Sequence, residues 1–359
     1  MIHGIGGKVS IVGVAVAVLF ATSVWNSYSW RAESLEHDQK GVEGPLERAR
    51  GALKDKIRNG GLRSGCCSTS TKIGCALGEA PNILTIYFMV QAMGERLGDD
   101  LTVLLDNVYG IEKQGKWSYT YGAPLDADVS AYALLALHHL GFSVDVEPMF
   151  DFYIPHTQSF VTFNGRLSPG KEYEIVPEQS GFAGDNLMIH PEVNINVFRL
   201  LKRTGFGDLV NYELVADSFS SEGFVSSFYY PSKYFGTWLA IDLVGRMEEF
   251  EEKVDRAVQY IAKTQNTDGS WGEPGNSWDT ALAINALICA GYKGGALDRG
   301  VQYLLAVQHD DGMWHTDSVI WVYPFDFRGN RGTWLSYDSS GVLTTSLVVI
   351  AFDELKRRI

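Results

Sequence analysis

Apolar residues recur at helical spacing along most of the chain after residue 45. Val254, Ala257, Val258, Ile261 and Ala262 follow one another at i, i+3, i+4, i+7 and i+8, which places them on one face of a helix. The segment 278–290 is instead apolar nearly all round, so we expect it to lie in the interior. These two kinds of segment alternate, which predicts pairs of one amphipathic outer helix and one apolar inner helix.

About six such pairs are predicted, so the expected fold class is all-α. The outer helices are predicted at 45–58, 99–112, 145–153, 206–219, 250–265 and 297–308. The inner helices are predicted at 81–96, 126–140, 190–201, 234–244, 278–290 and 342–356. An array of this period forms either an open solenoid or a closed ring. We expect a ring, because a wholly apolar helix must be covered on every side.

A short motif, Gln-x-x-x-Gly-x-Trp, follows two of the outer helices. It runs from Gln265 to Trp271 and again from Gln308 to Trp314, about 43 residues later. Its glycine ends the helix, because glycine readily takes the left-handed backbone angles of a chain reversal. The tryptophan then has a large ring to bury against neighbouring helices.

This motif resembles the glutamine–tryptophan repeat of the squalene cyclase and protein prenyltransferase β-subunit superfamily. The resemblance covers residues 45–359 and is most specific in the last two helix pairs. It implies an α/α toroid, in which the inner helices surround a central cavity and the outer helices surround the inner ones.

Composition narrows the class of ligand. The chain has 359 residues and a net charge of −13, with no basic stripe, which argues against nucleic acid as a partner. Aromatic residues make up 12% of the chain, enough to line a cavity as well as fill a core. The four cysteines match no zinc spacing; disulfides and idle buried thiols both stay open.

The N-terminal residues 9–25 are nearly uncharged. About 17 apolar residues are the lower limit for crossing a bilayer and slightly exceed a signal-peptide core. A membrane anchor, a cleaved signal and a buried helix therefore all remain open for residues 1–30. If the segment spans, Lys8 on the inner side places the body outside the cytoplasm. Residues 31–44 are polar and are expected to form a tether to the toroid at 45–359.

Two aspartates open the second predicted inner helix. The segment 124–131 reads Pro-Leu-Asp-Ala-Asp-Val-Ser-Ala and resembles the Asp-x-Asp-Asp motif of class II terpene cyclases, which protonate an alkene. The resemblance makes Asp128 the proton donor and Asp126 its helper, although Val129 replaces the last aspartate of the motif. Alkene protonation needs a neutral carboxylic acid in a dry site, and a second carboxylate nearby keeps one proton on the pair. The other hypothesis is helix capping, the role we also expect for Asp279.

Further residues near the starts of the inner helices are candidates for substrate binding. An aromatic-lined apolar cavity suits an isoprenoid or another lipid. Glu192 and Asn196 share one helix face, and His190 and Asn194 share the next, so these polar groups either meet a substrate head group or form a buried network. The substrate-binding candidates are Trp117, Tyr121, His190, Glu192, Asn194, Tyr230, Tyr234, Trp278, Trp321 and Trp334.

The chain lacks the motifs that other activities of the families it resembles would need. Protein prenyltransferase β-subunits hold zinc with an Asp-x-Cys pair, but Ala281 stands two residues after Asp279. We therefore expect no zinc, no other cofactor and no protein prenylation. No Asp-Asp-x-x-Asp motif for diphosphate ionisation occurs. Two hypotheses stand: a class II terpene cyclase-like enzyme that cyclises a linear isoprenoid, and a non-catalytic, membrane-anchored toroid that binds a lipid or a protein partner.

Overall fold

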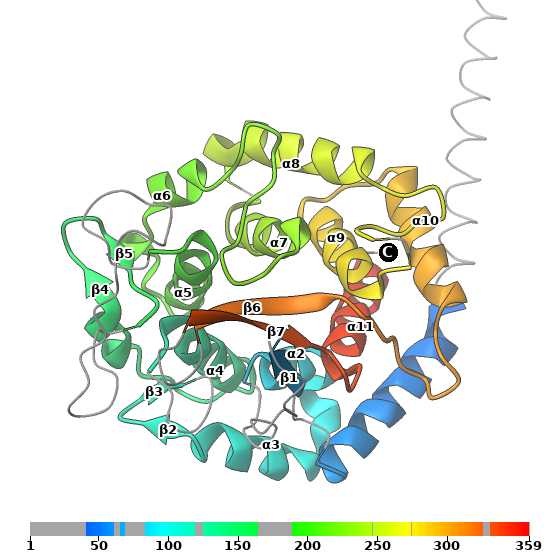
Figure 1. Ribbon diagram of the computed structural model, residues 1–359, viewed down its shortest axis with the longest axis horizontal. Helices are drawn as coiled ribbons and strands as arrows, with labels where there is room; N and C mark the ends of the chain where they lie inside the picture. Colours follow the sequence, from blue (N-terminus) through cyan, green and yellow to red (C-terminus); the bar gives the residue numbers. More distant parts are fainter. Residues whose placement is uncertain are drawn as a thin grey trace, which may run out of the picture.

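The inner helices form a closed ring (Figure 1). The computed structural model describes residues 41–60, 65–68, 83–118, 125–163, 189–245, 247–273, 275–325 and 331–358. Within these ranges the ring consists of α2 (Ile83–Met93), α4 (Ala127–His139), α5 (Pro191–Arg203), α7 (Lys233–Val244), α9 (Ser277–Cys289) and α11 (Val342–Arg357). Each helix packs against the next, and α11 packs against α2. The predicted toroid is therefore confirmed as a closed ring.

The outer layer follows the amphipathic pattern. It contains the helix at 41–58, α3 (Asp100–Tyr109), α6 (Tyr212–Asp217), α8 (Glu251–Lys263) and α10 (Gly295–Ala306). In α8 the buried residues are Val254, Ala257 and Ile261, which lie on the predicted apolar face. The inner helices are buried nearly all round.

Two predicted outer helices are wrong in their extent. The segment predicted at 145–153 is the 3-10 helix η2 (Glu147–Phe152), and the chain then turns into a short hairpin of β4 (Tyr153–Ile154) and β5 (Ser159–Phe160). The helix predicted at 206–219 is split into η4 (Gly207–Leu209) and α6. The split occurs because Val210 is extended and the Asn211 side chain caps a new helix by accepting the N–H of Leu214.

Three tryptophans hold outer helices to inner helices in the same way. Each indole N–H donates to a carbonyl of the preceding outer helix, and each backbone N–H donates to a hydroxyl in the next inner helix. The indole bonds are Trp117 to Val108, Trp271 to Ile261 and Trp314 to Leu304, at 2.6–2.7 Å. The backbone bonds are Trp117 to Ser130, Trp271 to Thr280 and Trp314 to Thr345, at 2.9–3.0 Å. The predicted burial of the motif tryptophans is confirmed.

The motif glutamines connect neighbouring outer helices. Gln265 Nε2 donates to the carbonyl of Ala296 in α10 at 2.8 Å, and Gln308 Nε2 donates to the carbonyl of Pro45 at 2.9 Å. The second bond joins the last outer helix to the first, so it helps to close the ring. Gly312 is needed beside it, because its φ is +81° and a Cβ there would lie 2.9 Å from the carbonyl oxygen of Arg48.

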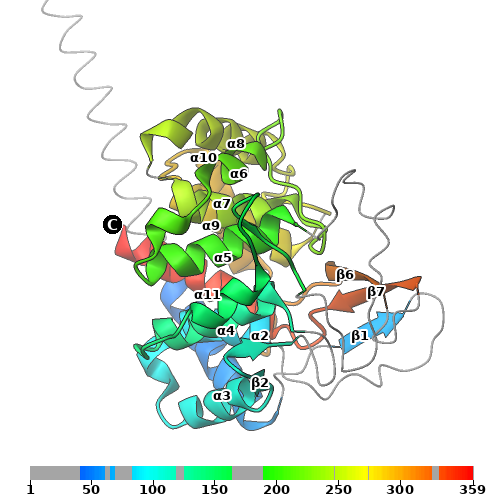
Figure 2. The ribbon, with the colours of Figure 1, turned by 90° about the vertical axis from the view of Figure 1, so that its left-hand side faces the viewer.

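The fold is mostly helical, as predicted, but it also contains a three-stranded antiparallel sheet that was not predicted. Its order is β1 (Gly65–Ser68), β7 (Arg331–Tyr337) and β6 (Val319–Phe325). Both long strands are rich in β-branched and aromatic residues, a composition that favours strands. A further two-stranded hairpin joins β2 (Glu112–Lys113) to β3 (Lys116–Trp117). The three-stranded sheet lies across one end of the ring, and the C-terminus lies at the other end (Figures 1 and 2).

The predicted membrane segment at 9–25 lies outside the described residues. Within the part of the chain that the structure describes, no helix has both the length and the apolar character needed to span a bilayer. Membrane association and the three-part domain division therefore stay predictions.

Candidate active site

Asp126 caps the N-terminus of α4. Its backbone is extended, with φ −128° and ψ 128°, and its Oδ1 accepts the backbone N–H groups of Asp128 and Val129 at 2.8 and 3.1 Å. The capping role considered for Asp128 thus belongs to Asp126. The prediction for Asp279 is also wrong, because Asn276 caps α9 and Asp279 instead accepts side-chain hydrogen bonds from Asn276 and Ser232.

Asp128 lies in the first turn of α4 and is held by side chains from two other elements. Its Oδ1 accepts a hydrogen bond from Asn196 Nδ2 of α5 at 2.9 Å. Its Oδ2 accepts one from the hydroxyl of Tyr230, in the loop before α7, also at 2.9 Å. Asp128 is 6% exposed. The carboxyl group is therefore fixed in orientation and shielded from water.

Burial changes the acidity of both aspartates. It raises the pKa of Asp128 to about 7, against the opposing effects of Tyr230, Asn196 and Arg199. Burial, and then the charge of Asp128, raises the pKa of Asp126 to about 8. Two interacting carboxyls titrate as a pair, so one proton stays on the pair near neutral pH.

Glu192 positions the loop that carries Tyr230. Its Oε1 accepts the backbone N–H groups of Phe228 and Tyr229 at 2.7 and 2.8 Å. The next residue, Tyr230, donates to Asp128. Burial raises the pKa of Glu192 to about 7. This carboxyl therefore belongs to the same buried cluster as the two aspartates.

His190 and Asn194 contact the segment around β5, and His190 also contacts the loop that Glu192 holds. His190 Nδ1 lies 2.8 Å from Thr162 Oγ1, and its ring stacks on Phe228 with centroids 4.3 Å apart. Asn194 binds both backbone groups of Phe160 in β5, at 2.7 and 2.9 Å. His190 thus contacts the same loop residue, Phe228, that Glu192 holds, whereas Asn194 contacts β5. Asn194 has a structural role here, since its amide holds β5 against α5.

Aromatic rings lie next to the acid. Tyr230 stacks on Phe235 with centroids 4.0 Å apart, and Phe235 stacks on Trp278 at 6.0 Å. One turn after Asp128, Tyr132 contacts the rings of Tyr87 and Phe88, at 5.1 and 6.0 Å. Aromatic faces attract cations, because the ring quadrupole is negative above the plane. The surroundings of Asp128 therefore suit a carbocation that forms beside it.

The other sequence-predicted site residues are distributed as follows. Trp117 packs between α3 and α4, as described above, and Tyr234 donates its hydroxyl to Thr264 at 3.0 Å, at the end of α8. Neither is retained as a proposed substrate contact. Trp321 and Trp334 lie in β6 and β7, at the end of the ring where the inner helices begin. Tyr121 lies outside the described residues.

The sequence did not single out Arg199, which extends the Asp128 network. Glu192, Asn196, Arg199 and Arg203 follow at i, i+4, i+7 and i+11 along α5, most of which is buried. Arg199 Nη1 donates to Asn196 Oδ1 at 3.1 Å, and Arg199 Nε binds Asp242 at 2.7 Å. A polar stripe on a buried helix was the signal that could have revealed this network.

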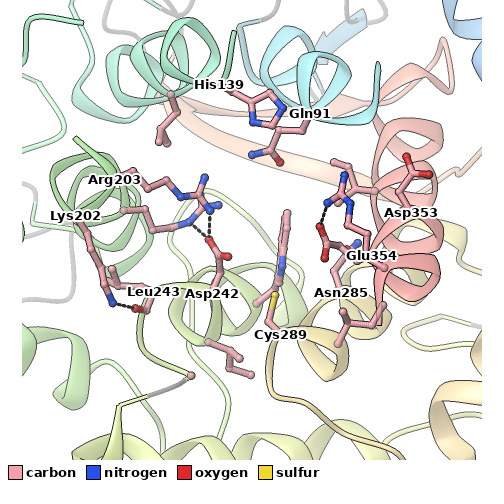
Figure 3. A pocket seen from close by; sticks show the side chains of 18 of the residues that line it. Gln91, His139, Lys202, Arg203, Asp242, Leu243, Asn285, Cys289, Asp353 and Glu354 are labelled. Atoms are coloured by element: carbon pink, nitrogen blue, oxygen red, sulfur yellow. Dashed lines mark hydrogen bonds and ion pairs between the residues drawn. The ribbon is translucent and has the colours of Figure 1, made fainter. Parts of the chain in front are cut away.

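A cavity of about 630 Å³ opens at the other end of the ring, where the inner helices end (Figure 3). Figure 3 shows the wall of this cavity, where the guanidinium of Arg203 in α5 donates a hydrogen bond to the carboxylate of Asp242 in α7. Arg199 also lines this cavity, while Asn196 stands between Arg199 and Asp128. Asp128 is therefore separated from the cavity by two buried side chains.

No three histidine, cysteine or carboxylate side chains among the described residues are grouped so that they could hold a metal ion. Cys289 is a free thiol. The absence of zinc and of any other cofactor stays a prediction from the sequence.

Comparison with known proteins agrees with this fold. Residues 229–321 match the model of the squalene-hopene cyclase C-terminal domain. The type II terpene cyclase MstE from Scytonema superposes with a TM-score of 0.70 at 15% identity, covering 90% of this chain and 100% of that chain. The chain thus has the fold of the squalene cyclase-like superfamily. A search of curated protein sequences finds no significant match.

Enzymes of other sizes and activities share the toroid. Part of ent-copalyl diphosphate synthase from Streptomyces platensis matches with a TM-score of 0.56 at 16% identity, covering 76% of this chain and 50% of that chain. Cellobiose 2-epimerase from Spirochaeta thermophila matches with a TM-score of 0.53 at 12% identity, covering 88% of this chain and 99% of that chain. The fold alone therefore does not decide the function.

Proposed function

We propose that this protein is a class II terpene cyclase-like enzyme that cyclises a linear isoprenoid by protonating it. The observation that carries the proposal is the setting of Asp128. It is a buried carboxyl with raised pKa, oriented by Asn196 and Tyr230, beside a second carboxyl and stacked aromatic rings.

Asp128 is the proposed acid rather than Asp126. Asp126 accepts two backbone N–H groups at a helix N-terminus, and both the hydrogen bonds and the helix dipole stabilise its ionised form. Burial raises the pKa of Asp126 to about 8 and that of Asp128 to about 7, so both carboxyls can hold the proton of the pair. We assign its delivery to Asp128, because Asp128 contacts the aromatic residue Tyr230 while Asp126 Oδ1 is held by the start of α4. Each Asp128 oxygen accepts one hydrogen bond, which leaves a lone pair on each for that proton.

The chemistry follows from this arrangement. Asp128 transfers its proton to one carbon of a terminal double bond, and the π electrons form the new C–H bond. The neighbouring carbon becomes a cation, which the aromatic ring of Tyr230 stabilises, backed by the stacked ring of Phe235. Further double bonds attack the cation in turn and close the rings.

The substrate class is a polyprenyl chain. MstE has been solved with geranylgeranyl dihydroxybenzoate as substrate, and its toroid spans nearly the whole of this chain. A single toroid of this size is therefore enough for cyclisation in a protein with the same fold. The head group of the substrate is not specified by this proposal, so the test uses several substrates.

The test is incubation of the protein with geranylgeranyl dihydroxybenzoate, geranylgeranyl diphosphate and squalene, followed by mass spectrometry of the products. We expect a cyclic isomer of at least one substrate from the wild type and none from Asp128→Asn. Asp279→Asn is the matched control, because Asp279 is a partly buried carboxyl in the first turn of another inner helix, α9. Cyclisation at the wild-type rate by Asp128→Asn would contradict the proposal, as would the lack of any cyclic product from the wild type.

A further inference from the structure

One carboxylate oxygen in the Asp128 cluster has no hydrogen-bond partner among the described residues. Glu192 is completely buried, and its Oε1 accepts two backbone N–H groups. Its Oε2 accepts none. A buried polar atom without a partner is costly, and native proteins leave few of them. An unpartnered oxygen beside a candidate catalytic acid indicates a group that acts on a bound molecule.

The spacing along α5 points Glu192 toward the same region as the acid. Glu192 and Asn196 are one helical turn apart on one face, and Asn196 binds Asp128. Glu192 therefore lies one turn nearer the start of α5, on the face whose side chains contact Asp128 and the loop before α7. Burial contributes most to the raised pKa of Glu192, and the nearby charge of Asp128 raises it further. The two carboxyls are close, and they resist being ionised together.

We propose that Glu192 Oε2 is the base that ends the reaction, an inference that rests on the proposed cyclase function. The final carbocation loses a proton from the carbon next to it. That proton bonds to Glu192 Oε2, and the electron pair of the broken C–H bond forms a double bond. Asp128 has lost one proton and Glu192 has gained one, so the product is an isomer of the substrate. One proton exchanged with solvent at each carboxyl restores the starting state.

Other unpartnered atoms nearby are weaker bases. Tyr132 Oη has no partner, but burial raises the pKa of Tyr132, so its phenolate does not form near neutral pH. His190 Nε2 has no partner either, but burial lowers the pKa of His190 to about 4. A carboxylate with a pKa of about 7 binds a proton far more tightly than that imidazole. Glu192 is therefore the best matched acceptor of the three.

The variant Glu192→Gln separates the proposed role of Glu192 as a base from its structural role in holding the loop that carries Tyr230. Glutamine keeps an oxygen for the N–H groups of Phe228 and Tyr229, so the loop that carries Tyr230 stays in place. It replaces the basic oxygen with an N–H₂ group. With a substrate that the wild type cyclises, we expect the alkene product to fall at least tenfold and water-captured alcohols to replace it, with Asp279→Asn unchanged. An unaltered product distribution in Glu192→Gln overturns the inference and leaves the role of Asp128 untouched.

A binding measurement tests the same inference without turnover. The probe is a polyprenyl tertiary amine whose ammonium group stands in for the final carbocation, titrated calorimetrically at pH 8.5. The wild type should bind it at least tenfold more tightly than its uncharged isopropyl analogue, and Glu192→Gln should lose most of that difference. Equal affinity for the two probes in the wild type overturns the inference. Failure of the wild type to bind either probe contradicts the polyprenyl substrate of the proposed function, and this inference with it.

Discussion

The hydroxyl of Tyr230 donates to Asp128 Oδ2 at 2.9 Å, and the Tyr230 ring stacks on Phe235. The Tyr230 side chain thus affects the acidity of Asp128 through its hydroxyl and packs its ring against the neighbouring aromatic residue Phe235. Because Glu192 holds the backbone of the two preceding residues, the position of Tyr230 depends on α5 as well as on its own loop.

Tyr230→Phe should slow cyclisation about ten- to hundredfold while leaving the fold intact. The ring and its stacking remain, but the hydrogen bond that lowers the pKa of Asp128 is lost. Asp128 then becomes a weaker acid. The measurement is the pH dependence of turnover, whose upper inflection should move to higher pH in the variant. An unchanged inflection with unchanged rate would show that Tyr230 does not act on the acid.

Turnover of the wild type should fall as pH rises through about 7. The acid works only while it holds its proton, and burial places the pKa of Asp128 near that value. The fall should reflect loss of protonation and not unfolding, which circular dichroism over the same range checks. A rate that stays constant from pH 5 to pH 9 would be incompatible with a carboxylic acid as proton donor.

Asp126→Asn and Asp126→Ala should separate capping from proton sharing. Asparagine caps helices as well as aspartate does, so Asp126→Asn should keep its stability, whereas Asp126→Ala should lose about 1 kcal/mol of unfolding free energy. Both variants remove the carboxyl that shares the proton. The upper pH limit of turnover should therefore shift downward in both, opposite to the shift in Tyr230→Phe. Denaturant unfolding and pH–rate profiles make the comparison, and equal stability of the two variants would contradict the cap.

Gln308→Ala should loosen the closure of the ring. Gln308 Nε2 donates to the carbonyls of Pro45 and Gly312, and losing both bonds should cost about 2 kcal/mol. Gln265→Ala is the matched control, because Gln265 makes the equivalent bonds to Ala296 and Gly269 within the array. Hydrogen exchange of the helix at 41–58 should speed up in Gln308→Ala and not in Gln265→Ala. Equal exchange of that helix in both variants would mean that Gln308 plays no special part in closure.

The helix pairs were predictable from sequence because burial repeats along the chain. The apolar faces of α8 and α9 and the two Gln-x-x-x-Gly-x-Trp motifs each report on contacts with neighbouring elements. The β6–β7 hairpin was not predicted, since Trp321 and Trp334 were interpreted as substrate-binding residues near an inner helix, although the composition of their segments favours strands. The split of the predicted outer helix near Val210 depends on one extended residue, which the spacing of apolar residues in the sequence does not reveal.

The site was predictable only in part, because its partners come from distant segments. The motif at 124–131 indicated Asp126 and Asp128, but only the fold shows that Asp126 caps α4 and that Asp128 meets Asn196 and Tyr230. Trp117 is an example of a residue that was predicted to bind substrate but has a structural role. It was grouped with the cavity aromatics, yet its indole bonds to Val108 as Trp271 bonds to Ile261.

The central claim is that a proton from the buried Asp128, and not loss of a leaving group, starts the reaction. The most direct test is cyclisation in D₂O by the wild-type protein, with deuterium counted in the product by mass spectrometry. We expect one solvent-derived deuterium per cyclic product, on a carbon of the former terminal double bond, and no such product from Asp128→Asn. A cyclic product that carries no deuterium, or one that Asp128→Asn forms equally fast, would contradict it.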